Sequence, residues 1–319
     1  MSDASAHLES DRGSHARGPL RARGAGEVID RLFSGLTLLS GAAVLAILAF
    51  IVWSTSRYAW PALSEQGWSF LTTNDWKPDA GHFGGLAFVF GTLVSSAIAV
   101  IIAVPISVAL ALFIAEVAPR RLRRTAVALV DLLAAVPSVV FGVVGLLFLR
   151  QPLQRVYVAL AGSSANGTSF MTAGIVLAFM ILPIITSVSR EVFTTVPDID
   201  KQGALALGAT RWEMFRASIL PYSYSGVTGA TMLGLGRALG ETIAVALVIG
   251  GNPQITGDLF KPGDTMAGTI ANTFFSENAG MGQRALIGLG VVLFAITVVV
   301  NMAARVVVTR AERRIQGAA

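Results

Sequence analysis

Six long apolar stretches dominate the sequence and restrict the folds that are open to it. A helix that crosses a bilayer needs about 20 mostly apolar residues, and each stretch is long enough. The stretches cover about residues 32–56, 85–117, 125–149, 170–189, 223–250 and 285–308. The pattern predicts an all-α, polytopic membrane protein with six transmembrane helices and short connecting loops.

The composition agrees with this class and excludes several others. Only 13% of the 319 residues are charged, against about 25% in a typical soluble domain. That fraction excludes a disordered protein, a nucleic-acid-binding domain and most soluble enzymes. The chain contains no Cys, which excludes disulfides, thiolate metal sites and Cys nucleophiles. We expect a disordered N-terminal tail over residues 1–30, a transmembrane domain over 31–309 and a C-terminal tail over 310–319.

Lys and Arg residues are distributed unevenly along the chain. Seventeen lie in the two tails and in the loops that follow the second and fourth stretches, against six in the remaining loops. Loops rich in Lys and Arg tend to stay in the cytoplasm, so both tails are predicted to be cytoplasmic. The remaining cation, Arg237, lies within the fifth stretch.

The fifth stretch carries an unusual set of residues at helical spacing. On a continuous helix they would share one face. They are Gly226, Ala230, Gly234, Arg237, Glu241 and Val245. An Arg near the centre of a bilayer costs at least about 2.5–3.5 kcal/mol, and pairing with a carboxylate four residues later would lower that cost. Two interpretations remain open from the residues alone: a buried ion pair that fixes packing, or a cation on the path of an anionic substrate.

Two other stretches carry features that bear on helix packing. In the second stretch, small and polar residues at helical spacing predict a face for close helix packing. These residues are Thr92, Ser95, Ser96, Ala99 and Ala103. Asp131 and the Pro137–Ser138 pair interrupt the third stretch, where proline removes a backbone hydrogen bond and can kink the helix.

The segment 190–221 carries a series of helix start and stop signals. Asp198 is a candidate N-cap for a short helix over 199–207, and Gly208 can take the left-handed conformation that ends it. Thr210 and Glu213 match a capping box for a second helix, which Leu220–Pro221 is expected to end. The signals predict a helix–Gly–helix elbow that projects into the cytoplasm, as a capped connector or as a rigid docking element.

The elbow sequence resembles a known motif. Lys201–Gly208, followed by Ile219-Leu220-Pro221, is similar to the EAA loop of ABC importer permeases, although Gln202 and Gly203 replace the usual Glu and Ala. The resemblance implies the MetI-like permease fold and a coupling helix that sits in a groove of an ATPase subunit. The coupling residues it implies are Gln202, Gly203, Ala204, Leu205, Gly208, Ala209, Thr210, Arg211 and Trp212.

Further motifs resemble one branch of that family. Gly236–Val245, Pro137–Gly142 and Ala204–Glu213 are similar to the C-type (PstC-like) permease of phosphate-specific importers. This resemblance implies inorganic phosphate as the substrate and a bacterial plasma membrane as the location. It also implies a substrate path that includes Arg237, Glu241, Thr242 and Ser138. Permeases for sulfate or molybdate resemble the stretch around Arg237 too, so another oxyanion is the alternative substrate.

The same resemblance implies several partners. They are a homologous second permease (PstA-like), two ATPase subunits (PstB-like) that hold ATP and Mg, and an extracytoplasmic phosphate-binding protein (PstS-like). The chain itself is expected to bind no cofactor and no metal. Each of its three Lys residues is followed by Pro or Gln, so none completes the Gly-Lys-Ser/Thr motif of a P-loop.

Two other classes of protein fit the sequence less well. An enzyme would need a catalytic constellation, but the three His residues lie outside the apolar stretches and no zinc-protease or Gly-x-Ser-x-Gly motif occurs. A secondary transporter would usually have more helices and an internal repeat. It would also have no obvious use for the elbow. We therefore expect a transport subunit that works by alternating access and has no ATPase site of its own.

Overall fold

The computed structural model describes residues 25–161, 167–276 and 280–316. The chain divides into two compact units, residues 1–54 and 55–319. The first unit contains most of helix α1 (Ala25–Gln66). This helix begins inside the range expected for the N-terminal tail, and residues 1–24 of that tail lie outside the described residues. At the other end, helix α13 continues to Gln316, through most of the expected C-terminal tail.

The second unit consists almost entirely of helices. After the last residues of α1, its elements are α2 (Ser69–Thr72), β1 (Trp76–Lys77), a 3₁₀ turn (Pro78–Ala80), β2 (His82–Phe83), α3 (Leu86–Leu112), a π turn (Phe113–Val117), α4 (Arg120–Ala135) and α5 (Ser138–Val144). They continue with a π turn (Gly145–Leu149), α6 (Arg150–Ala161), α7 (Phe170–Thr194), α8 (Asp198–Ala206), α9 (Arg211–Met214) and a π turn (Phe215–Ile219). The last are α10 (Leu220–Gly240), α11 (Ile243–Ile249), α12 (Met266–Thr273) and α13 (Met281–Gln316). The short strands β1 and β2 pair antiparallel.

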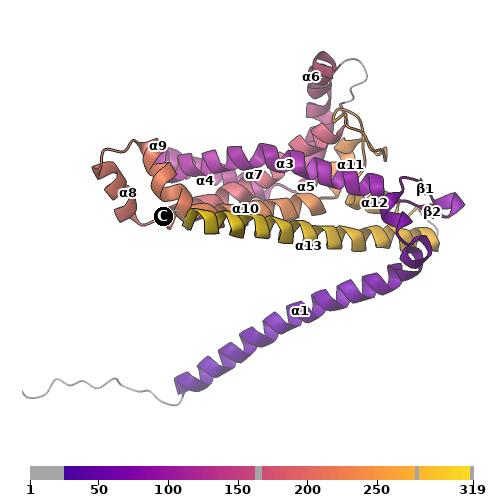
Figure 1. Ribbon diagram of the computed structural model, residues 1–319, viewed down its shortest axis with the longest axis horizontal. Coiled ribbons are helices and arrows are strands. Elements are labelled where there is room, and N and C mark those ends of the chain that lie inside the picture. The colour runs from indigo at the N-terminus through magenta and orange to yellow at the C-terminus, as the bar shows by residue number, and fades with distance from the viewer. Residues whose placement is uncertain (1–24, 162–166, 277–279, 317–319) are drawn as a thin grey trace, which may run out of the picture. The chain divides into compact units, whose positions relative to one another are not determined.

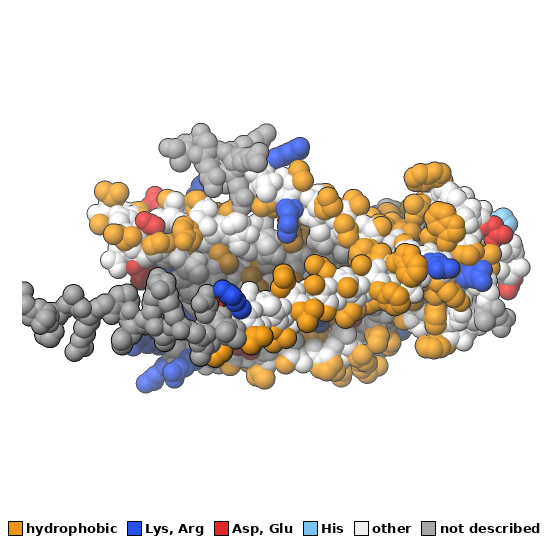
Figure 2. All heavy atoms as spheres, turned by 90° about the horizontal axis from the view of Figure 1, so that it is seen from below, with side chains coloured by type: hydrophobic (Ala, Val, Ile, Leu, Met, Phe, Trp, Pro, Cys, Tyr) orange, Lys and Arg blue, Asp and Glu red, His pale blue; other side chains and the backbone are white. Residues whose placement is uncertain are grey.

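The helices confirm the prediction of a polytopic, all-α membrane protein. Within the described residues, five helices are long and apolar enough to cross a membrane, and a bent pair brings the number to six if it counts as one span. Figure 1 shows α3, α7, α10 and α13 running side by side, with α8 and α9 at one end of these helices and β1 and β2 at the other. Hydrophobic side chains cover much of the surface seen in Figure 2, as expected for a protein in contact with lipid.

The third stretch differs from its prediction. Instead of one helix over 125–149, the chain breaks at Val136–Pro137, and the membrane-length helical segment is Ser138–Leu160. The break has a local cause, because a residue before proline is driven out of the helical region. Val136 is extended, with a ψ of 127°. Consequently Arg150 and Arg155, expected in a loop, lie in α6.

The core forms where small residues allow helices to approach closely. The predicted small-polar face of α3 is buried, as are Thr172, Ala173 and Gly174 on α7. A Cβ atom on Gly174 would collide with Ile98, so this glycine is needed for the contact between α3 and α7. Helix α10 packs on the same α7 through Gly226 and Gly234, whose missing side chains leave room for Val192 and Ile185. The three helices form the framework that holds the candidate site.

Candidate functional site

The fifth span is not a continuous helix. Helix α10 ends at Gly240, Glu241 is extended with a ψ of 132°, and α11 starts at Ile243. The two segments meet at an angle of 64°. The prediction of one helix over 223–250 is therefore wrong at this point, and the break lies directly beside the candidate substrate-path residues.

This break separates Arg237 from Glu241. Arg237 lies in the last turn of α10 and is exposed, whereas Gly226, Ala230 and Gly234 on the same helix face α7. Within the described structure no ion pair joins Arg237 to Glu241. The half-buried carboxylate of Glu241 instead accepts a hydrogen bond from the backbone N–H of Ala244 at 3.4 Å. The expected helical pairing of these two residues is therefore wrong, because helical i,i+4 geometry ends at Gly240.

The break in the fifth span lies beside the break in the third. Helix α11 packs against α5, and a Cβ on Gly142 would come within 2.8 Å of the Cα of Ala244. Three residues further along, Gly145 at the start of the π turn lies against Val248 in the same way. These contacts place α5 alongside α11. Ser138 begins α5 and Thr242 directly precedes α11, so the four candidate path residues are distributed around two adjacent helix breaks.

The elbow over residues 190–221 follows its predicted design closely. Helix α8 ends before Gly208, which takes the left-handed conformation with a φ of +87°. Thr210 and Glu213 form both halves of the capping box that starts α9. One detail is wrong: Asp198 is the first residue of α8 and Pro197 is its N-cap. Proline suits this place because its fixed φ is compatible with the entry into a helix.

The end of the elbow also differs from its prediction. Leu220–Pro221 does not end the helix, because α9, a π turn over Phe215–Ile219 and α10 follow one another without a break. The π turn ends two residues before Pro221, and its wider i→i+5 hydrogen bonding is a local adjustment that lets a membrane helix accommodate a proline. The elbow is therefore joined to Arg237 by one helical segment, Arg211–Gly240.

The coupling residues implied by the resemblance lie mostly at the surface. Exposed members are Gln202, Gly203, Leu205, Gly208, Thr210, Arg211 and Trp212, and half-buried members are Ala204 and Ala209. Large apolar side chains stand out among their neighbours, with Ile199 78%, Leu207 90% and Trp212 64% exposed. Ile199 and Leu207 lie outside the candidate membrane spans, where exposed apolar surface is typical of a protein–protein contact.

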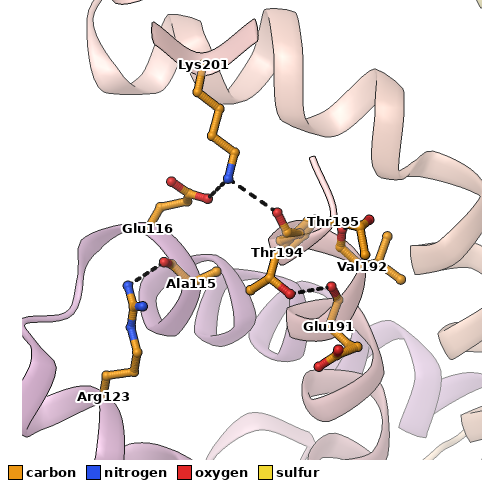
Figure 3. Close-up of polar contacts among 9 residues, drawn as sticks. Ala115, Glu116, Arg123, Glu191, Val192, Thr194, Thr195 and Lys201 are labelled. Atoms are coloured by element: carbon orange, nitrogen blue, oxygen red, sulfur yellow. Dashed lines mark hydrogen bonds and ion pairs between the residues drawn. The ribbon is translucent and has the colours of Figure 1, made fainter. Parts of the chain in front are cut away.

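One group of residues near the elbow has no role in the sequence-based prediction. The carboxylate of Glu116, in the π turn that follows α3, forms an ion pair with the Nζ atom of Lys201 on α8 at 2.6 Å. Arg123 on α4 donates a hydrogen bond to the carbonyl of Ala115 in the same turn at 2.6 Å. Figure 3 shows Lys201 reaching from α8 to the Glu116 carboxylate, and Arg123 approaching the turn from α4. An acidic residue at the end of an apolar stretch is a signal for such a contact, but the sequence does not indicate its partner.

Comparison with known proteins identifies the family. Residues 107–317 match the model of the binding-protein-dependent transport system inner membrane component family. The chain is 39% identical over 299 residues to a protein of Mesorhizobium japonicum named phosphate transport system permease protein PstC, covering 89% of this chain and 91% of that protein. It is 41% identical over 302 residues to the PstC protein of Pasteurella multocida, covering 90% and 94%.

Solved structures agree on the fold. A bacterial ABC transporter involved in the import of the acidic polysaccharide alginate gives a TM-score of 0.59 at 16% identity, covering 88% of this chain and 99% of that chain. The MetNI methionine ABC transporter in an inward-facing conformation gives 0.51 at 20% identity, covering 71% and 93%. These likenesses confirm the predicted MetI-like ABC permease fold. Together with the sequence relatives, they establish that the chain is a multi-span inner membrane permease of the binding-protein-dependent transport family and belongs to its PstC branch.

Proposed function

We propose that this chain is the permease subunit through which an ABC importer moves inorganic phosphate into the cell. The observation that carries the proposal is the similarity of nearly the whole chain to proteins named phosphate transport system permease PstC, at about 40% identity. The similarity extends over about nine tenths of each chain, so it includes both the helix breaks and the elbow.

The substrate path is proposed to pass the two adjacent helix breaks. Arg237 would bind phosphate oxygens there, because its planar fork of donors matches an oxyanion. The first turns of α5 and α11 would add the partial positive charge of helix N-termini, which favours anions. Ser138 and Thr242 would supply hydroxyl donors. Glu241 would limit the affinity of the site, since a translocation site must also release its cargo.

The chain is proposed to work in a complex of several subunits. A homologous permease (PstA-like) would complete the path, because Arg237 is exposed on a single copy of this chain. Two ATPase subunits (PstB-like) would hold ATP and Mg, and one of them would bind the exposed apolar elbow. A phosphate-binding protein (PstS-like) would deliver the substrate from outside. Both termini would lie in the cytoplasm, as the distribution of Lys and Arg favours.

Phosphate uptake by the reconstituted complex tests the proposal. Proteoliposomes that contain this chain, the PstA-like permease and the PstB-like ATPase would be loaded with ATP. Labelled phosphate and the PstS-like binding protein would then be added outside. We expect uptake that depends on ATP and resists an excess of unlabelled sulfate or molybdate. Uptake of labelled sulfate or molybdate in place of phosphate would contradict the substrate assignment and favour the alternative oxyanion.

A further inference from the structure

The coupling helix α8 is attached to the rest of the chain by few contacts. None of its residues is buried. Ser218 donates a hydrogen bond of 3.4 Å to the carbonyl of Asp200, but Ser218 belongs to the elbow itself. The ion pair of Lys201 with Glu116, at 2.6 Å, is much shorter and reaches a different membrane helix. Among the described residues, this pair is therefore the closest polar link from α8 to α3.

The ion pair is largely shielded from solvent. The side chains of Lys201 and Glu116 are only 12% and 19% exposed, so water screens the pair less than an ordinary surface pair. The Nζ atom of Lys201 also lies 3.5 Å from the carbonyl of Phe193 near the end of α7. The pair lies beside a half-open pocket that is otherwise lined by one cation, Arg211, and by the apolar residues Leu112, Val117, Leu205, Trp212, Met214 and Phe215.

The π turn that carries Glu116 is itself held in place. Because its hydrogen bonds are wider than those of an α-helix, a carbonyl in this turn can accept a bond from outside the helix. Arg123 on α4 donates such a bond to Ala115 at 2.6 Å. The turn over Phe113–Val117 thus connects α3, α4 and α8 (Figure 3).

The elbow is connected to the membrane helices by two different routes. One route is covalent, because α9 continues through the π turn into α10 and reaches Arg237. The other is the ion pair, which joins α8 to the end of α3. Both α3 and α10 pack on α7, so independent movement of either helix would disturb a shared interface.

We propose that Glu116 and Lys201 are positioning residues that make α3 move together with the coupling helix. This inference rests on the proposed function, since it assumes that an ATPase moves the elbow. When the elbow shifts, α10 follows through its covalent connection and α3 follows through the ion pair. Without the pair, the elbow would still dock and ATP would still be hydrolysed, but α3 would lag behind and less substrate would be moved per ATP.

The ratio of transport to ATP hydrolysis tests this coupling in the complete complex. We expect Glu116→Gln and Lys201→Gln each to lower the phosphate moved per ATP by at least about fivefold, the lower end of usual coupling effects. ATP hydrolysis and co-purification of the ATPase should stay within about twofold of the wild type. The charge-swapped double variant Glu116→Lys/Lys201→Glu should recover part of the ratio. Glu191→Gln is a matched control, since Glu191 is an exposed carboxylate at the same end of the bundle.

A spectroscopic measurement keeps the test independent of the substrate. The chain has no Cys, so Ile101→Cys on α3 and Asp200→Cys on α8 can be spin-labelled without background from this chain, in a complex whose partner subunits carry no reactive Cys. Ile101 is exposed and lies about 22 Å along the helix from Glu116. We expect the distance between the two labels to stay constant when ATP is trapped in a complex that keeps the ion pair of Glu116 with Lys201. In the Glu116→Gln background, this distance should shift or its distribution should broaden.

The outcomes separate the two proposals. A wild-type complex that takes up no phosphate would contradict the proposed function, and the label distances would still test the ion pair. An unchanged transport ratio in both single variants, or equal losses of uptake and hydrolysis, would overturn the positioning role. A label distance that behaves alike with and without the ion pair would overturn it as well.

Discussion

Two interruptions of the helical chain, the elbow and the break in the fifth span, are built in different ways. At the elbow, residues at the interruption determine it: Gly208 has a φ of +87°, and Thr210 and Glu213 cap the next helix. At the break, Gly240 ends α10, Thr242 is the N-cap of α11, and the Glu241 carboxylate accepts a hydrogen bond from the backbone N–H of Ala244. In addition, this interruption has a distant contact, since α11 packs closely on Gly142 of α5. The elbow is specified locally, whereas the break combines local residues with tertiary packing.

The strongest test of this comparison is a substitution at the distant contact. A Cβ on Gly142 would lie 2.8 Å from the Cα of Ala244 and 2.9 Å from Leu247. We expect Gly142→Val to force α5 and α11 apart, to cost about 1–3 kcal/mol of stability, and to abolish phosphate uptake. Thermal unfolding in detergent and uptake in proteoliposomes measure the two effects.

The control for that variant is another helical glycine. Gly229 on α10 has no atom within 4 Å of the position that a Cβ would take, so Gly229→Ala should leave uptake and the unfolding temperature at the wild-type level. Normal uptake in Gly142→Val would show that the break does not depend on the contact between α5 and α11.

A smaller effect on function is expected from a substitution of the elbow glycine, Gly208. At the φ of Gly208 an L side chain costs roughly 1–2 kcal/mol, so Gly208→Val should distort the elbow and weaken its binding to the ATPase. Co-purification of the ATPase with the permease measures this. Gly203→Ala is the matched variant, because Gly203 lies inside α8 with open space around it and alanine favours a helix. Equal ATPase binding by the Gly208 variant and the wild type would contradict a locally specified elbow.

The smallest effect on function is expected from removal of the helix cap at Thr210. The Oγ1 atom of Thr210 accepts a hydrogen bond from the backbone N–H of Glu213 at 3.3 Å, and loss of such a cap costs about 1 kcal/mol. Thr210→Val should therefore lower ATPase binding by less than Gly208→Val does. The same co-purification assay ranks the two variants, and a larger loss from Thr210→Val would reverse the proposed order.

The contrast also explains how far the sequence predicts this structure. Apolar length predicts the membrane class, and the turn and capping residues predict the elbow almost residue by residue. The break in the third stretch has a local cause in Pro137, but a proline inside an apolar run also occurs within continuous helices, as Pro105 in α3 and Pro183 in α7 illustrate. Pattern alone does not separate these two cases.

The parts that could not be predicted depend on contacts between distant residues. The bend at Glu241 requires α5 as a packing surface, and the ion pair of Glu116 with Lys201 joins residues 85 positions apart. The helical spacing of Arg237 and Glu241 predicted a pair that the bend prevents. Both residues nevertheless lie at the break, and their role in the substrate path stays a prediction.

The central claim is that the substrate passes the broken fifth span. Phosphate uptake by an Arg237 variant tests this claim most directly. Hydrogen bonds to charged groups contribute about 1.5–3 kcal/mol, so Arg237→Gln should slow uptake by about tenfold or more. Glu241→Gln should also change the rate of uptake, and Arg121→Gln, at an exposed position on α4, should not. Near-normal uptake in both Arg237→Gln and Glu241→Gln, with normal assembly of the complex, would contradict this account.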